Sequence, residues 1–350
     1  MKTVAAVQTA YELPLVVDEL ELPDPKPHQV IVKLFSSGVC HSQLHQMHEP
    51  EHHRPLVFGH EGTGIVTSVG HEVDHVREGD HAIVTWVPRA PIKGRPKRTN
   101  SGALYRGEEV SSFICSTWAE DTLVDAKYVI PVPKNAPKDV SCVVGCAVLT
   151  GAGAVLHTAK VRPGDSVAVF GVGGVGMSAI KMAAILEAFP IIAVDLKHDK
   201  LEFAREFGAT HVVNASESDP VESVIDISKG GVDYAFDAIG VRATNEQILP
   251  ATREGGPGAD NIGGMAVLIG IPGKQMTLDP GLFTYYQRQY RGSLGATYPE
   301  RDFQMYLRLH AEGKFPLDKL VTKRYKLDQI NEACDALDAG QILGRAILEF

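Results

Sequence analysis

Residues 166–176 read Ser-Val-Ala-Val-Phe-Gly-Val-Gly-Gly-Val-Gly, and this stretch decides the fold. An apolar run ends at Phe170 and is followed by G-x-G-x-x-G, with its glycines at Gly171, Gly173 and Gly176. The run predicts a buried strand, and the residues after it predict a helix. In such a turn the first glycine permits the tight bend, the second lets the backbone approach a pyrophosphate, and the third lets helix and strand pack closely. The pattern therefore predicts a dinucleotide site at a helix N-terminus.

The next apolar run carries the second half of this signature. It ends at Asp195, 19 residues beyond Gly176. A carboxylate there accepts hydrogen bonds from the adenosine ribose hydroxyls and repels a 2′-phosphate, which favours NAD over NADP. The alternative is a glycine-rich turn that holds no ligand.

Strand and helix patterns alternate through the second half of the chain. The stretch His198–Phe207 is typical of the amphipathic segments between the apolar runs, and this alternation predicts a doubly wound parallel sheet, hence an α/β fold. We expect this Rossmann domain to span residues 148–294. The apolar runs that predict its strands are 166–171, 190–195, 211–214, 232–237, 264–270 and 289–294.

Short β-rich segments separated by Gly, Pro and Asp turns fill the first 147 residues. Gln29–Leu34, Gly64–Val69 and His81–Trp86 are examples. The C-terminal part predicts helices near 299–312 and 327–339 and a last strand, Arg345–Glu349. We expect residues 1–147 and 295–350 to form a second, β-rich domain.

Composition excludes several classes of protein. The 350 residues are 44% hydrophobic and 22% charged, as in globular proteins, and the net charge of −9 gives no general attraction to nucleic acid or anionic membranes. The longest apolar stretch, Val167–Phe189, contains Lys181 and four glycines and predicts a strand, turn and helix in place of a membrane span. The N-terminus lacks the apolar core of a secretory signal, and five cysteines fit a reducing, cytoplasmic setting.

Thiol and imidazole side chains suggest a metal site. Ten of the 14 histidines fall between His28 and His81. Cys40, His60 and Cys146 form a Cys₂His set, which suits a catalytic zinc that keeps a fourth position open. Their spacing matches no short zinc-finger pattern, and an isolated cysteine is commonly a small buried apolar residue. The residues alone leave the metal open.

Taken together, the motifs resemble those of the zinc-dependent medium-chain alcohol dehydrogenases, and the likeness covers essentially the whole chain. The motifs, in that family's order, are GVCHS (38–42), GHEGTGIV (59–66), a V-x-x-V-G/GD-x-V-like run (66–84), GCAVLTG (145–151), GVGGVG (171–176) and the ending GRAILEF (344–350). The resemblance implies a GroES-like catalytic domain beside the Rossmann domain.

The resemblance also assigns a metal site and a proton relay. Ser42 matches the hydroxyl that takes the alcohol proton, and His45 matches the imidazole at the solvent end of the relay. Glu61 matches a glutamate that approaches the metal during ligand exchange. The zinc ligands implied are Cys40, His60 and Cys146.

A cofactor site follows from the same likeness. His41 stands where many relatives place an Arg on the pyrophosphate, and Arg345 where a late Arg returns to the phosphates. Lys200 matches a contact to the adenosine ribose, and Thr150 and Val175 lie where the family holds the nicotinamide. The cofactor-binding residues implied are His41, Thr150, Gly171, Gly173, Gly174, Val175, Gly176, Asp195, Lys200, Ile271 and Arg345.

One segment departs from the family. Many relatives bind a structural zinc through four cysteines in a lobe that corresponds to Pro88–Ser112, which here has no Cys. We therefore expect one zinc per chain, with the lobe held in another way or mobile, and its basic residues either solvated or in contact with a partner. The substrate pocket implied by the resemblance includes Trp86, Phe113, Ile114 and Ile271.

The predicted activity is reversible hydride transfer from a primary or secondary alcohol to NAD⁺, which gives an aldehyde or ketone. Two alternatives remain: a zinc-free quinone or enoyl reductase of the same superfamily, and a non-catalytic NAD-binding structural protein. The intact Cys₂His set disfavours the first, and Ser42 with His45 disfavours the second. By analogy with the family, we expect a homodimer or homotetramer.

Overall fold

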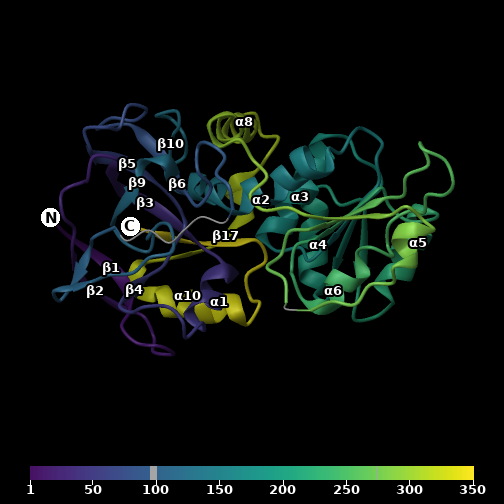
Figure 1. The fold of residues 1–350 in the computed structure, drawn as a ribbon, viewed down its shortest axis with the longest axis horizontal. Helices are drawn as coiled ribbons and strands as arrows, with labels where there is room; N and C mark the ends of the chain where they lie inside the picture. Colours follow the sequence, from purple (N-terminus) through teal and green to yellow (C-terminus); the bar gives the residue numbers. More distant parts are fainter. Residues whose placement is uncertain (95–100, 274) are drawn as a thin grey trace. The chain divides into compact units, whose positions relative to one another are not determined.

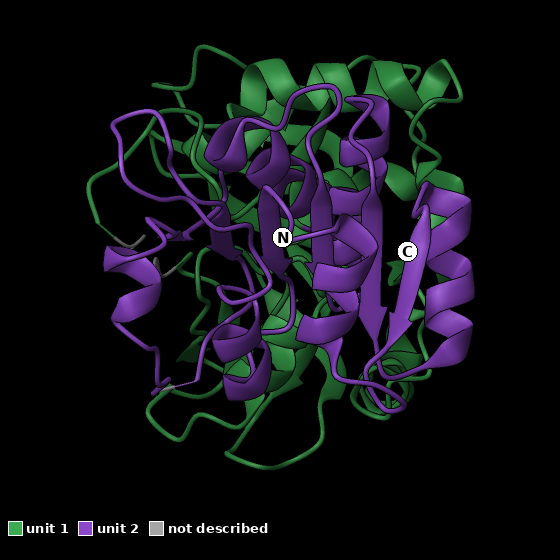
Figure 2. Cartoon of the chain, turned by 90° about the vertical axis from the view of Figure 1, so that its right-hand side faces the viewer, with its two compact units in different colours: residues 1–146, 298–350 green, residues 147–297 purple. Residues whose placement is uncertain are grey.

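The computed structural model describes residues 1–94, 101–273 and 275–350, which form two compact units. Unit 1 comprises residues 1–146 and 298–350, and unit 2 comprises residues 147–297 (Figure 2). Unit 1 is β-rich, whereas unit 2 alternates strands and helices (Figure 1).

Unit 2 is built on a six-stranded parallel sheet, in the order β13-β12-β11-β14-β15-β16. Numbered from its first strand, this is the order 3-2-1-4-5-6 of dinucleotide-binding folds. The predicted doubly wound sheet is confirmed, and each apolar run contains one strand. The strands are β11 (Val167–Phe170), β12 (Ile191–Asp195), β13 (His211–Asn214), β14 (Tyr234–Asp237), β15 (Met265–Leu268) and β16 (Gln289–Gly292).

Helices connect these strands. The amphipathic stretch His198–Phe207 forms α4 as expected, and it buries Leu201, Ala204 and Phe207. The helices are α2 (Ala147–Gly153), the π-helical η3 (Ala154–Ala159), α3 (Gly174–Ile185), α4 (His198–Phe207), α5 (Pro220–Ser228), α6 (Arg242–Gln247) and α7 (Gly281–Thr284).

Unit 1 contains two sheets. One has the order β4-β1-β2-β7-β8, and the other has the order β10-β6-β5-β3-β18-β17, with β9 also paired to β3. The long strand β3 is central because it pairs with β5, β9 and β18. The strands are β1 (Lys2–Gln8), β2 (Val16–Glu21), β3 (Gln29–Val39), β4 (Leu56–Val57), β5 (Glu61–Val69), β6 (His81–Thr85), β7 (Leu104–Tyr105), β8 (Glu108–Glu109), β9 (Asp121–Asp125), β10 (Val129–Pro131), β17 (Val321–Tyr325) and β18 (Arg345–Glu349).

The helices of unit 1 include one that starts at a predicted metal ligand. Helix α1 begins directly after Cys40 and packs on α10 (Figure 1), where Leu44 joins Ala333 and Leu337 in one core cluster. The helices are α1 (His41–Met47), η1 (Ala126–Tyr128), η2 (Val140–Gly145), α8 (Pro299–Ala311), α9 (Leu317–Leu320), η4 (Leu327–Gln329) and α10 (Ile330–Asp338).

The cysteine-free segment 88–112 is held by strand pairing in its described part. Strands β7 and β8 form a hairpin that extends the first sheet through β2. Tyr105 is buried, and its hydroxyl donates a hydrogen bond of 2.9 Å to Asp18. Residues 95–100, which carry much of the expected basic charge, lie outside the described residues. Apolar burial and β-pairing therefore hold residues 104–109 of the segment.

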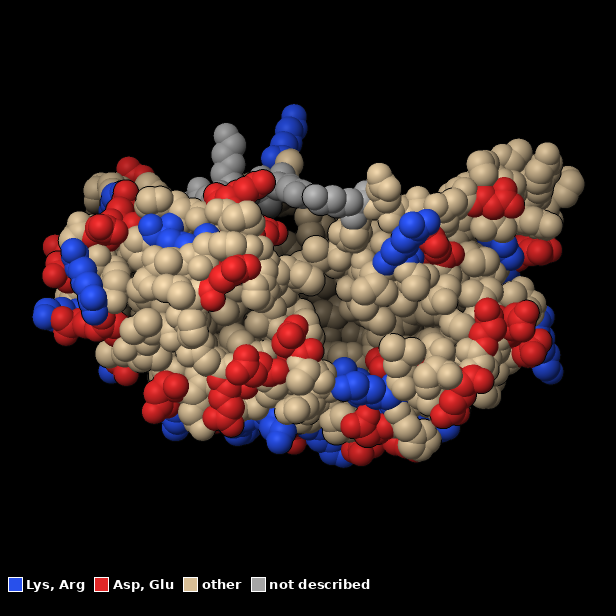
Figure 3. Space-filling view, turned by 90° about the horizontal axis from the view of Figure 1, so that it is seen from below, with Lys and Arg blue, Asp and Glu red and all other residues tan. Residues whose placement is uncertain are grey.

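Charges are mixed on the face shown in Figure 3, where acidic and basic side chains alternate over the surface. This pattern gives that face no single-sign patch of the kind that attracts a polyanion. Among the described residues, no helix is long and apolar enough to cross a membrane.

Candidate metal centre and dinucleotide site

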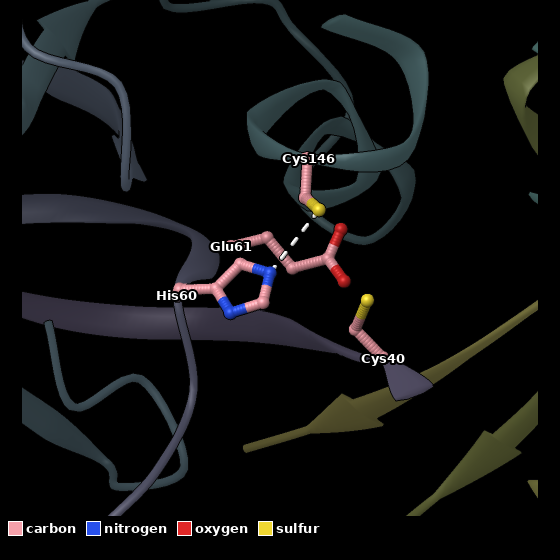
Figure 4. A group of neighbouring side chains, drawn as sticks. All are labelled: Cys40, His60, Glu61 and Cys146. Atoms are coloured by element: carbon pink, nitrogen blue, oxygen red, sulfur yellow. Dashed lines mark hydrogen bonds between the residues drawn. The ribbon is translucent and has the colours of Figure 1, made fainter. Parts of the chain in front are cut away.

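Four side chains of unit 1 converge in one buried cluster (Figure 4), which we call the metal centre: Cys40, His60, Glu61 and Cys146. One potential ligand atom from each lies within 4.8 Å of all the others. No other group of three or more His, Cys, Asp or Glu of this kind occurs among the described residues. Residues 95–100 and 274 contain none of these four residue types.

Strand pairing brings these residues together. Cys40 follows β3, and His60 directly precedes β5, whose Gly62 pairs with Ser37 of β3. Cys146 follows η2, where the Thr85 hydroxyl donates a 2.7 Å hydrogen bond to the carbonyl of Gly145. Three segments distant in sequence thus place their ligand atoms at one point.

Gly38 makes room for the carboxylate in this cluster. A Cβ at Gly38 would overlap the side chain of Glu61. The indole nitrogen of Trp118 fixes the same position with a 3.1 Å hydrogen bond to the carbonyl of Gly38. The residue at position 38 must therefore be glycine for Glu61 to lie beside Cys40.

The donor set fits zinc. Two thiols and an imidazole are ligands that zinc takes, with a fourth position left for water or substrate. Ligands bound at 2.0–2.3 Å in a tetrahedron lie about 3.3–3.8 Å from one another. The His60 Nε2 to Cys146 Sγ distance is 3.1 Å, so these atoms are already close to that spacing.

The electrostatics of the centre favour a thiolate. The hydrogen bond with the Cys146 thiol, aided by the charges of Arg345 and His60, holds the pKa of Cys40 well below its usual range, although burial opposes this. The same hydrogen bond and burial raise the pKa of Cys146. These shifts favour the thiolate form of Cys40, and a thiolate is the form of cysteine that binds metals.

Arg345 lies inside this cluster. Because β18 pairs antiparallel with β3, with Ala346 opposite Val39, Arg345 comes to lie beside Cys40. Its guanidinium forms an ion pair with Glu61, and both side chains are almost fully buried. Burial raises the pKa of Glu61 to about 7, and the Arg345 cation opposes that rise. The phosphate contact that the resemblance implies for Arg345 stays a prediction.

The predicted relay residues lie on one face of α1. Ser42 and His45 are three residues apart, a spacing that places side chains on the same side of a helix. The Ser42 hydroxyl oxygen is buried and has no hydrogen-bond partner within the described structure, whereas His45 is exposed. A buried hydroxyl left without a partner fits a ligand that would supply one. His41 is exposed at the start of the same helix.

Sequence reasoning missed Gln43 on this helix. The Gln43 side chain is 1% exposed, its Oε1 accepts a 3.1 Å hydrogen bond from the Cys40 amide, and its Nε2 contacts Nδ1 of His60. A Gln three residues after a helix N-cap is the signal that could have found it, because that spacing defines a capping box.

In unit 2 the glycine-rich turn has the predicted form. Helix α3 starts at Gly174, directly after the turn, so its first amides are free to bind phosphate. A Cβ at Gly176 would overlap the carbonyl oxygen of Gly171, and Gly171 itself has φ +89°. Glycine is therefore required at both positions by close approach and by backbone conformation.

Asp195 is fixed against this turn. At the end of β12, its carboxylate accepts hydrogen bonds of 3.0 Å from the amide of Val172 and 2.8 Å from that of Leu196. Lys200 is on α4, in the segment that follows. The Thr150 hydroxyl on α2 is buried without a hydrogen-bond partner within the described structure, as expected of a group reserved for a ligand.

The residues predicted to line the substrate pocket lie in different surroundings. Trp86 directly follows Thr85, which ends β6 and pairs with Glu61. Phe113 packs edge-on against His52, with ring centroids 4.4 Å apart. Ile114 packs against the core cluster around Tyr128 and lines a cavity with His28 and Leu123, and its place in the substrate pocket stays a prediction. In unit 2, Ile271 is 54% exposed.

A β-rich unit with a Cys₂His centre and a unit with a dinucleotide turn define a zinc- and NAD-dependent oxidoreductase. Comparison with known families agrees: residues 26–134 match the alcohol dehydrogenase GroES-like domain, and residues 174–312 match the zinc-binding dehydrogenase domain. The chain belongs to the zinc-dependent medium-chain alcohol dehydrogenase family, whose members are oxidoreductases acting on CH–OH groups.

Individual relatives are similar over nearly their full length. The probable S-(hydroxymethyl)glutathione dehydrogenase 1 of Schizosaccharomyces pombe is 32% identical over 365 residues, which cover 97% of this chain and 95% of the relative. The structure of an alcohol dehydrogenase zinc-binding domain protein from Burkholderia ambifaria has a TM-score of 0.90 at 31% identity, over 100% of this chain and 99% of its own. Benzyl alcohol dehydrogenase from Acinetobacter calcoaceticus has a TM-score of 0.89 at 28% identity, over 100% and 99% of the two chains.

Proposed function

We propose that this protein catalyses the reversible oxidation of a primary or secondary alcohol by NAD⁺, with one catalytic zinc per chain. The observation that carries the proposal is the convergence of Cys40, His60 and Cys146 in unit 1, with one potential ligand atom of each within 4.8 Å of the others. Family membership supports the reaction class.

Two bound groups supply the chemistry that side chains lack. When bound by Cys40, His60 and Cys146, zinc supplies a Lewis acid that makes the alcohol proton easier to remove. When bound at the turn of Gly171–Gly176, NAD⁺ accepts the hydride. Hydrogen bonds to the backbone fix Gly171 and Asp195. The cofactor-binding turn is therefore preorganised.

Two side chains of helix α1 remove the alcohol proton. The unpartnered hydroxyl of Ser42 takes the alcohol proton while it gives up its own proton toward His45, and exposed His45 on the same helix face releases a proton to solvent. An imidazole suits this task because it gains and loses a proton near neutral pH. In the reverse direction the same groups return the proton to the carbonyl oxygen.

Asp195 makes NAD the preferred cofactor. Its carboxylate is held beside the turn by the amides of Val172, Leu196 and Lys197, so a 2′-phosphate there would meet a fixed negative charge. We infer the same preference from the position of Asp195 at the end of the second strand of the sheet.

The choice of alcohol is open between the classes that the relatives' names mention. One relative is named for S-(hydroxymethyl)glutathione and another for benzyl alcohol. Trp86, which the resemblance assigns to the substrate pocket, would offer an aromatic face there, and this favours a benzylic or other aromatic primary alcohol as the better substrate.

The test is NADH formation by the purified protein with a panel of alcohols: benzyl alcohol, ethanol, 2-propanol and S-(hydroxymethyl)glutathione. We expect turnover with NAD⁺ and the highest kcat/KM for benzyl alcohol. The variant Cys40→Ser should abolish turnover, whereas Cys334→Ala, which alters a buried cysteine of α10, should keep it. Full activity in Cys40→Ser would refute the metal-dependent reaction, and turnover of quinones or enoyl compounds in place of alcohols would favour the zinc-free reductase.

We also propose a cytoplasmic setting and self-association. All five cysteines are free and buried, which suits a reducing compartment. A homodimer or homotetramer is proposed by analogy with the family, and sedimentation analysis would measure it.

A further inference from the structure

The C-terminal end of helix α1 is held by Arg54, which lies beyond the helix in the sequence. Its Nη2 donates hydrogen bonds to the carbonyls of Met47 at 3.3 Å and of Glu49 at 3.2 Å, and its Nη1 donates one of 2.7 Å to the carbonyl of His52. The last carbonyls of a helix have no partner within the helix, so other donors must satisfy them. Arg54 therefore completes the hydrogen bonding at the end of α1 and ties the following loop to it.

Two side chains from the N-terminal part of the chain extend this contact. Gln8 is 1% exposed at the end of β1; its Oε1 accepts a 3.0 Å hydrogen bond from Nε of Arg54, and its Nε2 donates one of 3.3 Å to the carbonyl of Met47. The Arg54 guanidinium lies 5.3 Å from the centre of the Tyr11 ring, and the Tyr11 hydroxyl donates a 3.4 Å hydrogen bond to the carbonyl of His48. The end of α1 is thereby connected to β1, a largely buried strand of the first sheet.

The positive charge of Arg54 suits this position. The C-terminal end of a helix carries a partial negative charge from its aligned carbonyls, and a cation there is stabilising. The acceptors that the structure gives Arg54 are an amide oxygen and backbone carbonyls, all of them uncharged, and the nearby carboxylate of Glu49 pairs with His52. A planar guanidinium with five N–H donors reaches several carbonyls at once, whereas a lysine ammonium is a compact point charge.

This anchoring bears on the two residues of α1 that remove the alcohol proton. Ser42 is in the first turn, where the Gln43 side chain accepts a 3.1 Å hydrogen bond from the Cys40 amide, and His45 is in the last turn. A helix of 7 residues is too short to be stable on its own, so its last turn depends on contacts with the rest of the protein. The position of His45 relative to Ser42 therefore depends on what holds the C-terminal end.

We propose that Arg54 is a positioning residue for proton transfer: by holding the last turn of α1, it keeps His45 where it receives the proton that Ser42 gives up. This inference rests on the relay proposed above. It goes further by assigning a role in that relay to a residue outside the metal centre and the glycine-rich turn. Loss of Arg54 should loosen His45 while Cys40 and Ser42 stay in place.

The first measurement is amide hydrogen exchange of α1 in the purified, zinc-containing protein. Arg54→Met removes every hydrogen bond of the guanidinium. It should raise the exchange rates of the His48 and Glu49 amides, which donate to carbonyls of the last turn, at least about 10-fold. Arg253→Met is the matched control, because Arg253 in unit 2 also donates a 2.8 Å hydrogen bond to a backbone carbonyl, that of Ile262. It should leave exchange in α1 unchanged.

The second measurement is the pH profile of alcohol oxidation. In Arg54→Met, kcat should fall about 10-fold near pH 6 and less than about 2-fold near pH 10, where hydroxide replaces the imidazole. Zinc content and NADH affinity should equal those of the wild type. Arg54→Lys keeps the charge and should recover part of the lost kcat and of the lost exchange protection. If Arg54→Met does not fold, Gln8→Leu, which removes the acceptor of Arg54 Nε, should show the same pH-selective loss to a smaller degree.

Two results would overturn the assignment. Equal exchange of α1 in Arg54→Met and the wild type would show that Arg54 does not hold the helix end. An equal loss of kcat at every pH, or loss of zinc from the variant, would show that Arg54 only stabilises the fold. Absence of alcohol oxidation by the wild type would instead refute the proposed function, and the exchange rates would still decide whether Arg54 holds α1.

Discussion

Arg345 and Glu61 form a buried ion pair beside two thiols, a costly arrangement for a protein to maintain. Charges removed from water are compensated only if their partners remain in place. Here the guanidinium is 7% exposed and the carboxylate 0% exposed, so neither has water as a substitute. Removal of Arg345 takes the counter-ion from both Glu61 and Cys40, so these buried groups must either take up protons or bear an unpaired charge.

Replacing Arg345 by Met should therefore lower the free energy of unfolding by about 3–5 kcal/mol. Urea denaturation of the variant and the wild type measures this difference. Arg324→Met is the control, because Arg324 pairs with Asp139 and Glu349 at the surface, with 40% of its side chain exposed, and its loss should cost only about 0–1 kcal/mol. Equal decreases in the free energy of unfolding for the two variants would show that the buried Arg345–Glu61 pair stabilises the fold no more than a surface ion pair does.

His45→Gln tests the relay on α1. The variant should depress alcohol oxidation most at low pH, where proton removal is hardest, and much less at high pH, where hydroxide substitutes for the imidazole. The measurement is kcat/KM for the alcohol across pH 6 to 10. A uniform decrease over that range would instead indicate a structural role for His45.

At the scale of elements, the strand–turn–helix from β11 to α3 is the most constrained part of unit 2. The apolar run, the glycine pattern and Asp195 are local in sequence, so this part could be predicted from the chain. The helix at His198–Phe207 and the strand at Arg345–Glu349 also begin and end at the predicted residues.

Other features could not be predicted because they depend on distant pairing. Arg345 approaches Glu61 because of the register of β18 on β3. This register brings Arg345 beside Cys40, although the two residues are more than 300 positions apart in the sequence. The β7–β8 hairpin consists of strands of two residues each, too short for an alternating pattern to appear. The contact between Gln43 and His60 joins two segments that are distant in sequence, so only the capping-box spacing of Gln43 was visible in the chain.

Gly176→Ala should weaken cofactor binding at the glycine-rich turn. The added Cβ would overlap the carbonyl of Gly171, so the backbone must move away from the position that receives the pyrophosphate. Fluorescence titration should show NADH affinity reduced at least about 10-fold, with zinc content unchanged. Gly292→Ala, at a position on β16 with nothing within 4 Å of an added Cβ, is the control. Wild-type affinity in Gly176→Ala would mean that the cofactor does not use this turn.

Asp195→Gly tests cofactor choice at the end of β12. Loss of charge-assisted hydrogen bonds to the ribose should weaken NAD binding by about 1.5–3 kcal/mol and remove the repulsion of a 2′-phosphate. The ratio of kcat/KM for NAD⁺ and NADP⁺ measures the change. A wild-type enzyme that already uses both cofactors equally would show that Asp195 does not select between them.

In the whole molecule, the metal centre and the glycine-rich turn that would bind the cofactor belong to different units. All four residues of the metal centre belong to unit 1, and the glycine-rich turn with Asp195 belongs to unit 2. Loss of the metal should therefore leave NADH binding measurable.

The central claim is that Cys40, His60 and Cys146 hold one catalytic zinc. The most direct test is metal analysis of the purified protein and of Cys40→Ser by atomic emission, with NADH titration as the check that the variant is folded. We expect about one zinc per wild-type chain and essentially none in Cys40→Ser, which still binds NADH. Two zinc ions per chain, or full zinc content in Cys40→Ser, would contradict it.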